Sequence, residues 1–380
     1  MKVVFDALSQ VGAGSRTYLK NVLPRLEKSE DVHFTVLWPA GISRPAKMSV
    51  HKQVSFVELP LPQKPPILRF LYEQCILPVR CRNADVLFSP VDIAPFRCPC
   101  PVILAIRNPN PFYDIQRSFR SQLQMGLKKW LITLSAQNAS RVIFVSHKSR
   151  NHIASQVGLS RENTHVIYHG LDHERFQPRS AKGIVNKPSS IPDAVDDYLL
   201  CVSTIYEHKN FEILLRGYEM LPASLRSVHP LLIVGGVVEQ TYFHSLQKLI
   251  AELDIEDHVR FVGSIPYLQI HEVYQHARAF ILPSLLETFG HTLVEAMACG
   301  VPVVAADATC IPEILDGAGL LFSPYQPREL ADHLESILTN QGLQQELIQK
   351  GVNRARDFTW DQTVSKLGKL LAEVGGVIGE

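Results

Sequence analysis

The sequence predicts an α/β protein made of two doubly wound parallel-sheet domains. Strand-like and helix-like segments alternate through both halves of the 380 residues. Segments such as 101–106 and 231–234 are short, continuous apolar runs, which are typical of parallel strands buried on both faces. Between the two series, residues 181–197 are rich in Pro, Ser, Lys and Asp without periodicity, which predicts a linker.

The first half opens with a strand at 3–5, a glycine loop that contains Gly12 and Gly14, and a helix from Arg16. This order is Rossmann-like. The loop is not a full Gly-x-Gly-x-x-Gly, and no acidic residue ends the next strand to hold a ribose, so a dinucleotide-dependent oxidoreductase is disfavoured. Further strands are expected at 32–38, 54–59, 84–89, 101–106 and 141–145, and a last one before His169-Gly170.

Residues 66–78 combine a broad apolar face with nearby basic side chains at Lys64, Arg69, Arg80 and Arg82. A helix packed inside the protein is the favoured interpretation. A helix that touches a membrane surface is the alternative.

The second half repeats the alternation, with strands expected at 198–203, 231–234, 259–263, 279–283 and 301–305. Residues 362–374 predict a last helix. We therefore expect a first domain at 1–180, the linker at 181–197, a second domain at 198–358, and a C-terminal helical segment at 359–380.

Two carboxylates, Glu287 and Glu295, flank the start of a predicted helix at 292–299, which Gly290 precedes and Gly300 ends. Backbone N–H groups at such a start can bind a diphosphate, and each carboxylate could accept hydrogen bonds from sugar hydroxyls. In the alternative interpretation, Thr292-x-x-Glu295 is a capping box that binds nothing, and Glu287 is an ordinary loop acid.

Composition limits the class of protein. A hydrophobic content of 46% with 20% charged residues is typical of a soluble globular chain, and no run of 18 apolar residues predicts a membrane span. Seven cysteines include no Cys-x-x-Cys pair, and Cys98-Pro-Cys100 is too closely spaced for ordinary metal ligation, so reduced thiols in a cytoplasmic protein are favoured over a disulfide or a metal site.

The net charge of +1 hides an asymmetry between the two halves. Residues 1–180 carry 24 basic and 12 acidic side chains, whereas the rest carries 14 and 25. A basic half predicts a surface that attracts anions, unless these charges are merely scattered over the domain. No nucleic-acid-binding motif accompanies them, which favours anionic lipid or a phosphate-linked acceptor over nucleic acid.

Residues 283–304 resemble the Glu-x7-Glu element of the retaining GT-B glycosyltransferases of the glycosyl transferases group 1 family. The resemblance extends over most of the chain and is strongest from Tyr198 to Phe358. It implies two Rossmann-like domains that face each other across a cleft, with the last helix packed back on the first domain. It also implies that Glu287 contacts the transferred sugar, Glu295 contacts the nucleotide ribose, and Lys209 holds the donor phosphates.

The sequence departs from the family pattern at two places. Arg107-Asn108 replaces a His-Asp pair, so Arg107 would meet phosphate and Asn108 a sugar hydroxyl, unless Arg107 pairs with a local acid. Ser203 and Thr204 occupy the region where an arginine is common. Taken with the motifs, the resemblance assigns catalytic roles to Glu287, Arg107 and Asn108, and donor binding to Gly12, Gly14, His169, Ser203, Thr204, Lys209, Gly235, Gly263, Phe289, Gly290, His291, Thr292 and Glu295.

The implied reaction moves a sugar, mannose or another hexose, from a nucleotide diphosphate sugar to a hydroxyl of a glycan or lipid-linked acceptor, with retention. Neither a metal nor a cofactor is expected, and no Asp-x-Asp is present. Cell-surface polysaccharide synthesis in a bacterium, by a cytoplasmic protein that is free or peripheral at the inner membrane, would fit. The alternatives are a GT-B nucleotide-sugar epimerase and a catalytically inactive sugar-nucleotide-binding protein.

Overall fold

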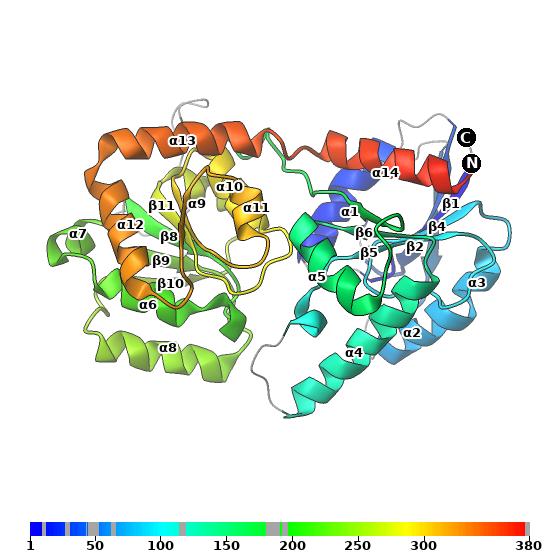
Figure 1. Ribbon diagram of the computed structural model, residues 1–380, viewed down its shortest axis with the longest axis horizontal. Coiled ribbons are helices and arrows are strands. Elements are labelled where there is room, and N and C mark those ends of the chain that lie inside the picture. Colours follow the sequence, from blue (N-terminus) through cyan, green and yellow to red (C-terminus); the bar gives the residue numbers. More distant parts are fainter. Residues whose placement is uncertain are drawn as a thin grey trace. The chain divides into compact units, whose positions relative to one another are not determined.

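The computed structural model describes residues 1–9, 13–26, 31–42, 44, 53–61, 66–113, 119–179, 191 and 197–376. It divides the chain into two compact units, of which the first comprises Met1–Gly170 with Trp360–Glu380 and the second comprises Leu171–Thr359 (Figure 1). The boundaries expected from the sequence are 180 and 358. Most of the expected linker, 181–197, lies outside the described residues.

The first unit contains a seven-stranded parallel sheet in the order β3-β2-β1-β4-β5-β6-β7. Its strands are β1 Lys2–Asp6, β2 His33–Pro39, β3 Val54–Leu59, β4 Val86–Ser89, β5 Val102–Ile106, β6 Arg141–Phe144 and β7 Thr164–Val166. Its helices are α1 Ala13–Leu26, α2 Pro66–Cys75, α3 Leu77–Arg80, α4 Phe119–Asn138, α5 His147–Val157 and α14 Trp360–Val374, with the 3-10 turn η1 Asn110–Phe112.

Two apolar cores lie on the two faces of this sheet. Alternate strand residues such as Phe5 and Phe88 pack with α1 and with Trp360 and Leu370 of α14. The opposite strand faces pack with α2, α3, α4 and α5. The C-terminal helix α14 therefore belongs to the first unit, where it contacts α1 (Figure 1).

The second unit contains a six-stranded parallel sheet in the order β10-β9-β8-β11-β12-β13. Its strands are β8 Tyr198–Val202, β9 Leu231–Val234, β10 Val259–Gly263, β11 Ala277–Leu282, β12 Val303–Ala306 and β13 Leu320–Phe322. Its helices are α6 Phe211–Glu219, α7 Ala223–Val228, α8 Gln240–Glu252, α9 Ile270–Gln275, α10 His291–Ala298, α11 Ile311–Leu315, α12 Pro327–Thr339 and α13 Gln341–Ala355, with the 3-10 turn η3 Glu207–Lys209.

Both sheets have the Rossmann strand order. Numbered within its own unit, the first sheet runs 3-2-1-4-5-6-7 and the second runs 3-2-1-4-5-6, so the order reverses between the first and fourth strands of each. Ligands of such sheets bind beyond the carboxyl ends of the strands at this reversal. In the second unit the reversal lies between β8 and β11, which are neighbours in the sheet.

Two sequence expectations need correction. The first helix begins at Ala13, so Gly14 lies inside α1 and not in the loop before it, while Gly12 falls outside the described residues. The helix expected over 66–78 is interrupted, because α2 ends at Cys75 and α3 begins at Leu77. Pro78 has no N–H to donate to the preceding turn, which explains the break. Among the described helices, none is long and apolar enough to cross a membrane.

Candidate active site

The loops that follow β8 and β11 bring together a lysine and a glutamate at the reversal of the second sheet. Lys209 ends η3, after β8, and Glu287 lies between β11 and α10. The Nζ atom of Lys209 donates a hydrogen bond to Oε1 of Glu287 across 2.6 Å, although the residues are 78 positions apart in sequence. Each side chain is 16% exposed, so the ion pair is reachable from solvent but largely shielded from it.

Backbone contacts hold these two loops in place. The N–H of Leu285 donates to the carbonyl of His208, which joins the loop after β11 to η3. The N–H of Glu287 donates to Oγ1 of Thr309 at 3.0 Å. Because both loops are fixed by their own backbone contacts, the charged groups are positioned before any ligand arrives.

Glu295 is buried in α10 and paired with a tyrosine. Its side chain is 7% exposed, and its Oε2 accepts a hydrogen bond of 2.9 Å from the hydroxyl of Tyr274, the second-to-last residue of α9. Burial raises the pKa of Glu295 to about 8, and the hydrogen bond from Tyr274 only partly opposes this. The carboxyl group is therefore mostly protonated at neutral pH in the unliganded protein.

The capping-box interpretation of Thr292-x-x-Glu295 is wrong. The N-cap of α10 is Gly290, with φ of 79° in the left-handed region that glycine adopts readily. Thr292 is the second residue of the helix, and Glu295 turns toward Tyr274. The helix start at His291 leaves its positive end beside the loop that carries Glu287. Phe289, 2% exposed, packs its ring 5.1 Å from that of His291 and anchors this loop.

Three further predicted residues meet at the carboxyl ends of β8, β9 and β10. Ser203 follows β8, and its N–H donates to the carbonyl of Val234. A side chain on Gly235 would place a Cβ atom 1.9 Å from the carbonyl oxygen of Ser203, so only glycine fits there. The N–H of Gly235 donates to the carbonyl of Gly263, which ends β10. Thr204 continues the chain from Ser203 and is half-buried.

In the first unit, Arg107 and Asn108 follow β5 and are bound through their backbone to one acid. Both N–H groups donate to Oδ1 of Asp92 at 2.9 Å. The other carboxylate oxygen of Asp92 lies 3.6 Å from Nζ of Lys128. The carboxylate thus fixes the backbone of the Arg107-Asn108 turn.

The side chain of Arg107 lines a small pocket of the first unit together with His169 and Tyr18. Its guanidinium carbon lies 4.6 Å from the centre of the Tyr18 ring, and the ring of His169 lies 5.4 Å from that ring. His169 is 7% exposed and also lies 6.0 Å from the ring of Trp360. The structure therefore brings two of the predicted residues together.

Sequence reasoning missed Tyr18 and Tyr274, which contact predicted residues in the first and second units respectively. Tyr18 lies on the helix after the glycine loop, which was a usable signal. Tyr274 lies in α9, away from the Glu287–Glu295 stretch in sequence, and nothing in the pattern points to it.

Two family sequence profiles match adjoining parts of the chain. The profile described as Glycosyl transferases group 1 matches residues 186–354, and that described as Glycosyltransferase Family 4 matches residues 12–175. Each match covers one of the two Rossmann-like halves.

Named relatives include two bacterial mannosyltransferases. The chain is 30% identical to O-antigen chain mannosyltransferase B of Escherichia coli over 171 residues, which is 44% of each chain. It is 24% identical to O-antigen chain mannosyltransferase RfbU of Salmonella typhimurium over 270 residues, which is 71% of this chain and 69% of the relative. The match therefore spans less than half the length of the first of these relatives.

Solved structures share the fold at low sequence identity. Sucrose-phosphate synthase from Thermosynechococcus elongatus matches with a TM-score of 0.78 and 18% identity over all of both chains. Anabaena HepE in complex with UDP-glucose matches with a TM-score of 0.73 and 20% identity over 98% of this chain and 100% of HepE. Both halves of the chain thus match glycosyltransferase family profiles, and its fold is that of the GT-B glycosyltransferases.

Proposed function

We propose that the protein transfers a hexose from a nucleotide diphosphate sugar to a hydroxyl group of a glycan or lipid-linked acceptor, with retention of the anomeric configuration. The observation that carries this proposal is the shielded Lys209–Glu287 pair at the strand-order reversal of the second sheet. A cation there can meet diphosphate charge, and a carboxylate beside it can hold sugar hydroxyls.

In the proposed step, the bond between the anomeric carbon and the diphosphate oxygen breaks, and the acceptor oxygen bonds to that carbon on the same face. The acceptor proton passes to the departing phosphate. Lys209 and the positive end of α10 would stabilise the charge that develops on the diphosphate. These groups take the place of a metal ion, so the reaction needs none. Glu287 would position the transferred sugar, and Glu295 would accept from the ribose.

Mannose is the proposed sugar, because both bacterial relatives are O-antigen mannosyltransferases. The same two names support a role in cell-surface polysaccharide synthesis. HepE was solved with UDP-glucose, and its fold is shared by this chain at only 20% identity, so the nucleobase of the donor has to be found by titration with GDP, UDP and dTDP.

The proposed acceptor is lipid-linked, which an exposed apolar surface on the first unit supports. This docking surface consists of residues on α2, α3 and α4, which pack on one face of the sheet. Its exposed side chains are Ile67, Leu68, Leu71, Ile76, Val79, Leu123, Leu127 and Trp130. Arg80 and Arg82 are exposed beside α3. Exposed apolar groups with neighbouring cations are suited to the surface of an anionic membrane.

Replacing Glu287 by alanine should abolish transfer and spare nucleotide binding. We expect turnover to fall at least about 100-fold, because one group positioned for the transition state is removed. The Kd of the nucleoside diphosphate should stay within about threefold of wild type. Turnover by product formation and Kd by calorimetry are the measurements, and Glu335→Ala, an exposed acid on α12, is the control. Turnover near the wild-type rate in Glu287→Ala would contradict the assignment of Glu287 to the transferred sugar.

Replacing Lys209 by alanine should weaken binding of the nucleoside diphosphate about 10- to 100-fold, the cost of one charge-assisted hydrogen bond. Lys350 offers a matched control, because its Nζ also lies 2.6 Å from a glutamate, Glu346, but both side chains are more than half exposed. Calorimetric titration of Lys350→Ala should match wild type. Equal affinities of wild type and Lys209→Ala would remove Lys209 from the phosphate site.

Binding of the nucleoside diphosphate should release a proton from Glu295. The free carboxyl is mostly protonated at pH 7, and ribose hydroxyls favour the ionised form, so binding lowers its pKa and affinity rises as the pH approaches 8. At pH 7 wild type should release up to about one proton more than Glu295→Gln, measured by calorimetry in buffers of different ionisation enthalpy. Phosphate protons cancel in this difference. Identical proton release by the two proteins would contradict a ribose contact at Glu295.

The docking surface should bind vesicles that contain anionic lipid at low salt. Replacing both Leu127 and Trp130 by serine should weaken co-sedimentation with these vesicles at least about tenfold, because each substitution removes an apolar side chain from the contact with lipid. Leu268→Ser is the control, since Leu268 is 60% exposed, like these residues, but lies in the second unit. Absence of vesicle binding by wild type, or an equal loss in the control, would exclude the proposed surface.

A further inference from the structure

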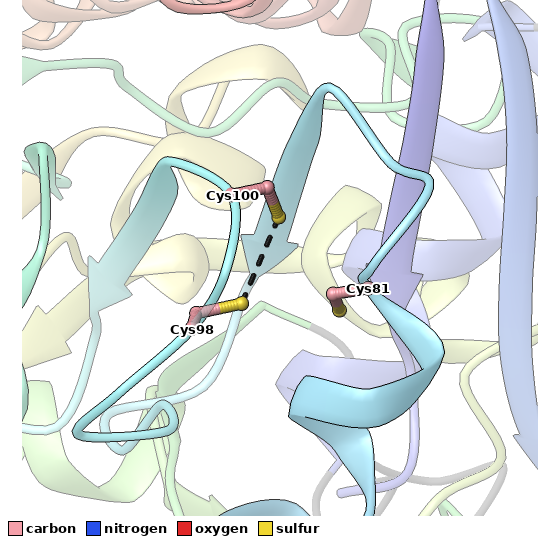
Figure 2. Close-up of side chains that lie close together, drawn as sticks. All are labelled: Cys81, Cys98 and Cys100. Carbon is pink, nitrogen blue, oxygen red and sulfur yellow. Dashed lines mark hydrogen bonds between the residues drawn. The ribbon is translucent and has the colours of Figure 1, made fainter.

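Three cysteines of the first unit form a cluster that is separate from the candidate active site. Cys81 caps the C-terminal end of α3, and Cys98 and Cys100 lie on the segment that leads into β5 (Figure 2). Their three sulfur atoms all lie within 4.8 Å of one another. The Sγ atoms of Cys98 and Cys100 are 3.7 Å apart, and all three are thiols.

By sequence spacing alone, Cys98-Pro-Cys100 is too close for ordinary metal ligation, and Cys81 lies 17 positions before Cys98. Cys98 and Cys100 lie on an irregular segment that bends at Pro99 and Cys100, and this bend brings their two sulfur atoms close together. Both sulfur atoms also lie near a third thiol. The end of α3 supplies that group, which only the fold brings near.

The sulfur spacing suits a metal ion. With metal–sulfur bonds of 2.3 Å, thiolates are about 3.8 Å apart in a tetrahedral site and about 4.0 Å apart in a trigonal one. The separation of 3.7 Å and the limit of 4.8 Å lie around these values, so small side-chain rotations would enclose an ion. A disulfide would instead require the sulfur atoms of Cys98 and Cys100 to approach to about 2.05 Å.

Two of the three thiols are buried, and the third is accessible to solvent, from which an ion could enter. Cys81 is fully buried and Cys100 is 8% exposed, whereas Cys98 is half-buried and faces solvent in part. The backbone N–H of Cys81 bonds to carbonyls of α3, and the carbonyl of Pro101 accepts from Leu87 of β4. The thiols thus sit on backbone that is already held in place.

We propose that Cys81, Cys98 and Cys100 bind a thiophilic d10 metal ion, either Zn²⁺ or Cu⁺. Sulfur ligands alone select such soft ions over Mg²⁺ or Ca²⁺. Three thiolates complete a trigonal Cu⁺ site, whereas Zn²⁺ would take a fourth ligand from solvent beside Cys98. On binding, three metal–sulfur bonds form and the thiol protons leave to water.

The site would have a structural role. Cys81 precedes β4 and Cys100 precedes β5, so the cluster lies at the amino ends of these strands, whereas Arg107 follows the carboxyl end of β5. The ion would tie α3 to the connection between β4 and β5. That same connection carries Asp92, whose carboxylate binds the backbone of Arg107 and Asn108. Bound metal would therefore stabilise the segment that positions this turn.

The test is titration of the full chain, reduced and stripped of metal, with Zn²⁺ and separately with Cu⁺. We expect one equivalent of at least one ion to bind, with a higher midpoint of thermal unfolding. In the folded protein the ion should slow alkylation of the half-buried Cys98 and leave the exposed Cys75 as reactive as before. This comparison needs no variant, so it stands even if a substitution impairs folding.

Variants identify the ligands. Cys98→Ser, at the half-buried position, should weaken binding at least about 100-fold, and Cys81→Ser should act in the same direction. Cys75→Ser, which removes an exposed thiol on α2 outside the cluster, should leave binding unchanged. Binding of Cu⁺ alone would identify a trigonal site, and binding of Zn²⁺ a solvent-completed one. Less than about a tenth of an equivalent of either ion, or equal binding by Cys98→Ser and wild type, would overturn the proposal.

Discussion

The reversal of strand order in the second sheet is the constraint on which the candidate site depends. Because β8 and β11 are parallel neighbours, the loops after them leave the same edge at the same point. Lys209 and Glu287 reach each other only for this reason, across 78 positions of sequence. An unpaired lysine or glutamate in this shielded place would raise the free energy of the folded state, because its charge is partly desolvated. The ion pair offsets part of this desolvation penalty.

Much of the fold could be predicted from the sequence. Parallel strands that are buried on both faces appear in the sequence as short apolar runs, and glycines often stand at helix ends. The strands at 54–59 and 259–263 lie where the pattern places them. Gly290, predicted before the helix of the Glu287–Glu295 stretch, is its N-cap. These signals are local, and each depends on a few neighbouring residues.

Features that join distant segments could not be predicted. The hydroxyl of Tyr274 reaches Glu295 because α9 packs beside α10, and no periodicity encodes that packing. The same holds for Cys81, which only the end of α3 brings to Cys98. The alternative interpretation of one local motif also proved wrong. Thr292-x-x-Glu295 fits a capping box in sequence, but Gly290 begins the helix and burial turns Glu295 inward.

The second unit is an insertion within the first, and its two ends meet. Leu171 enters it and Thr359 leaves it, and these residues pair in a parallel bridge, with the N–H of Leu171 donating to the carbonyl of Phe358. A module whose ends touch costs little loop-closure entropy to graft between two neighbouring points of another chain. Residues 171–359 therefore form a single insertion, and exchanging this range for that of a relative would leave both segments of the first unit unchanged.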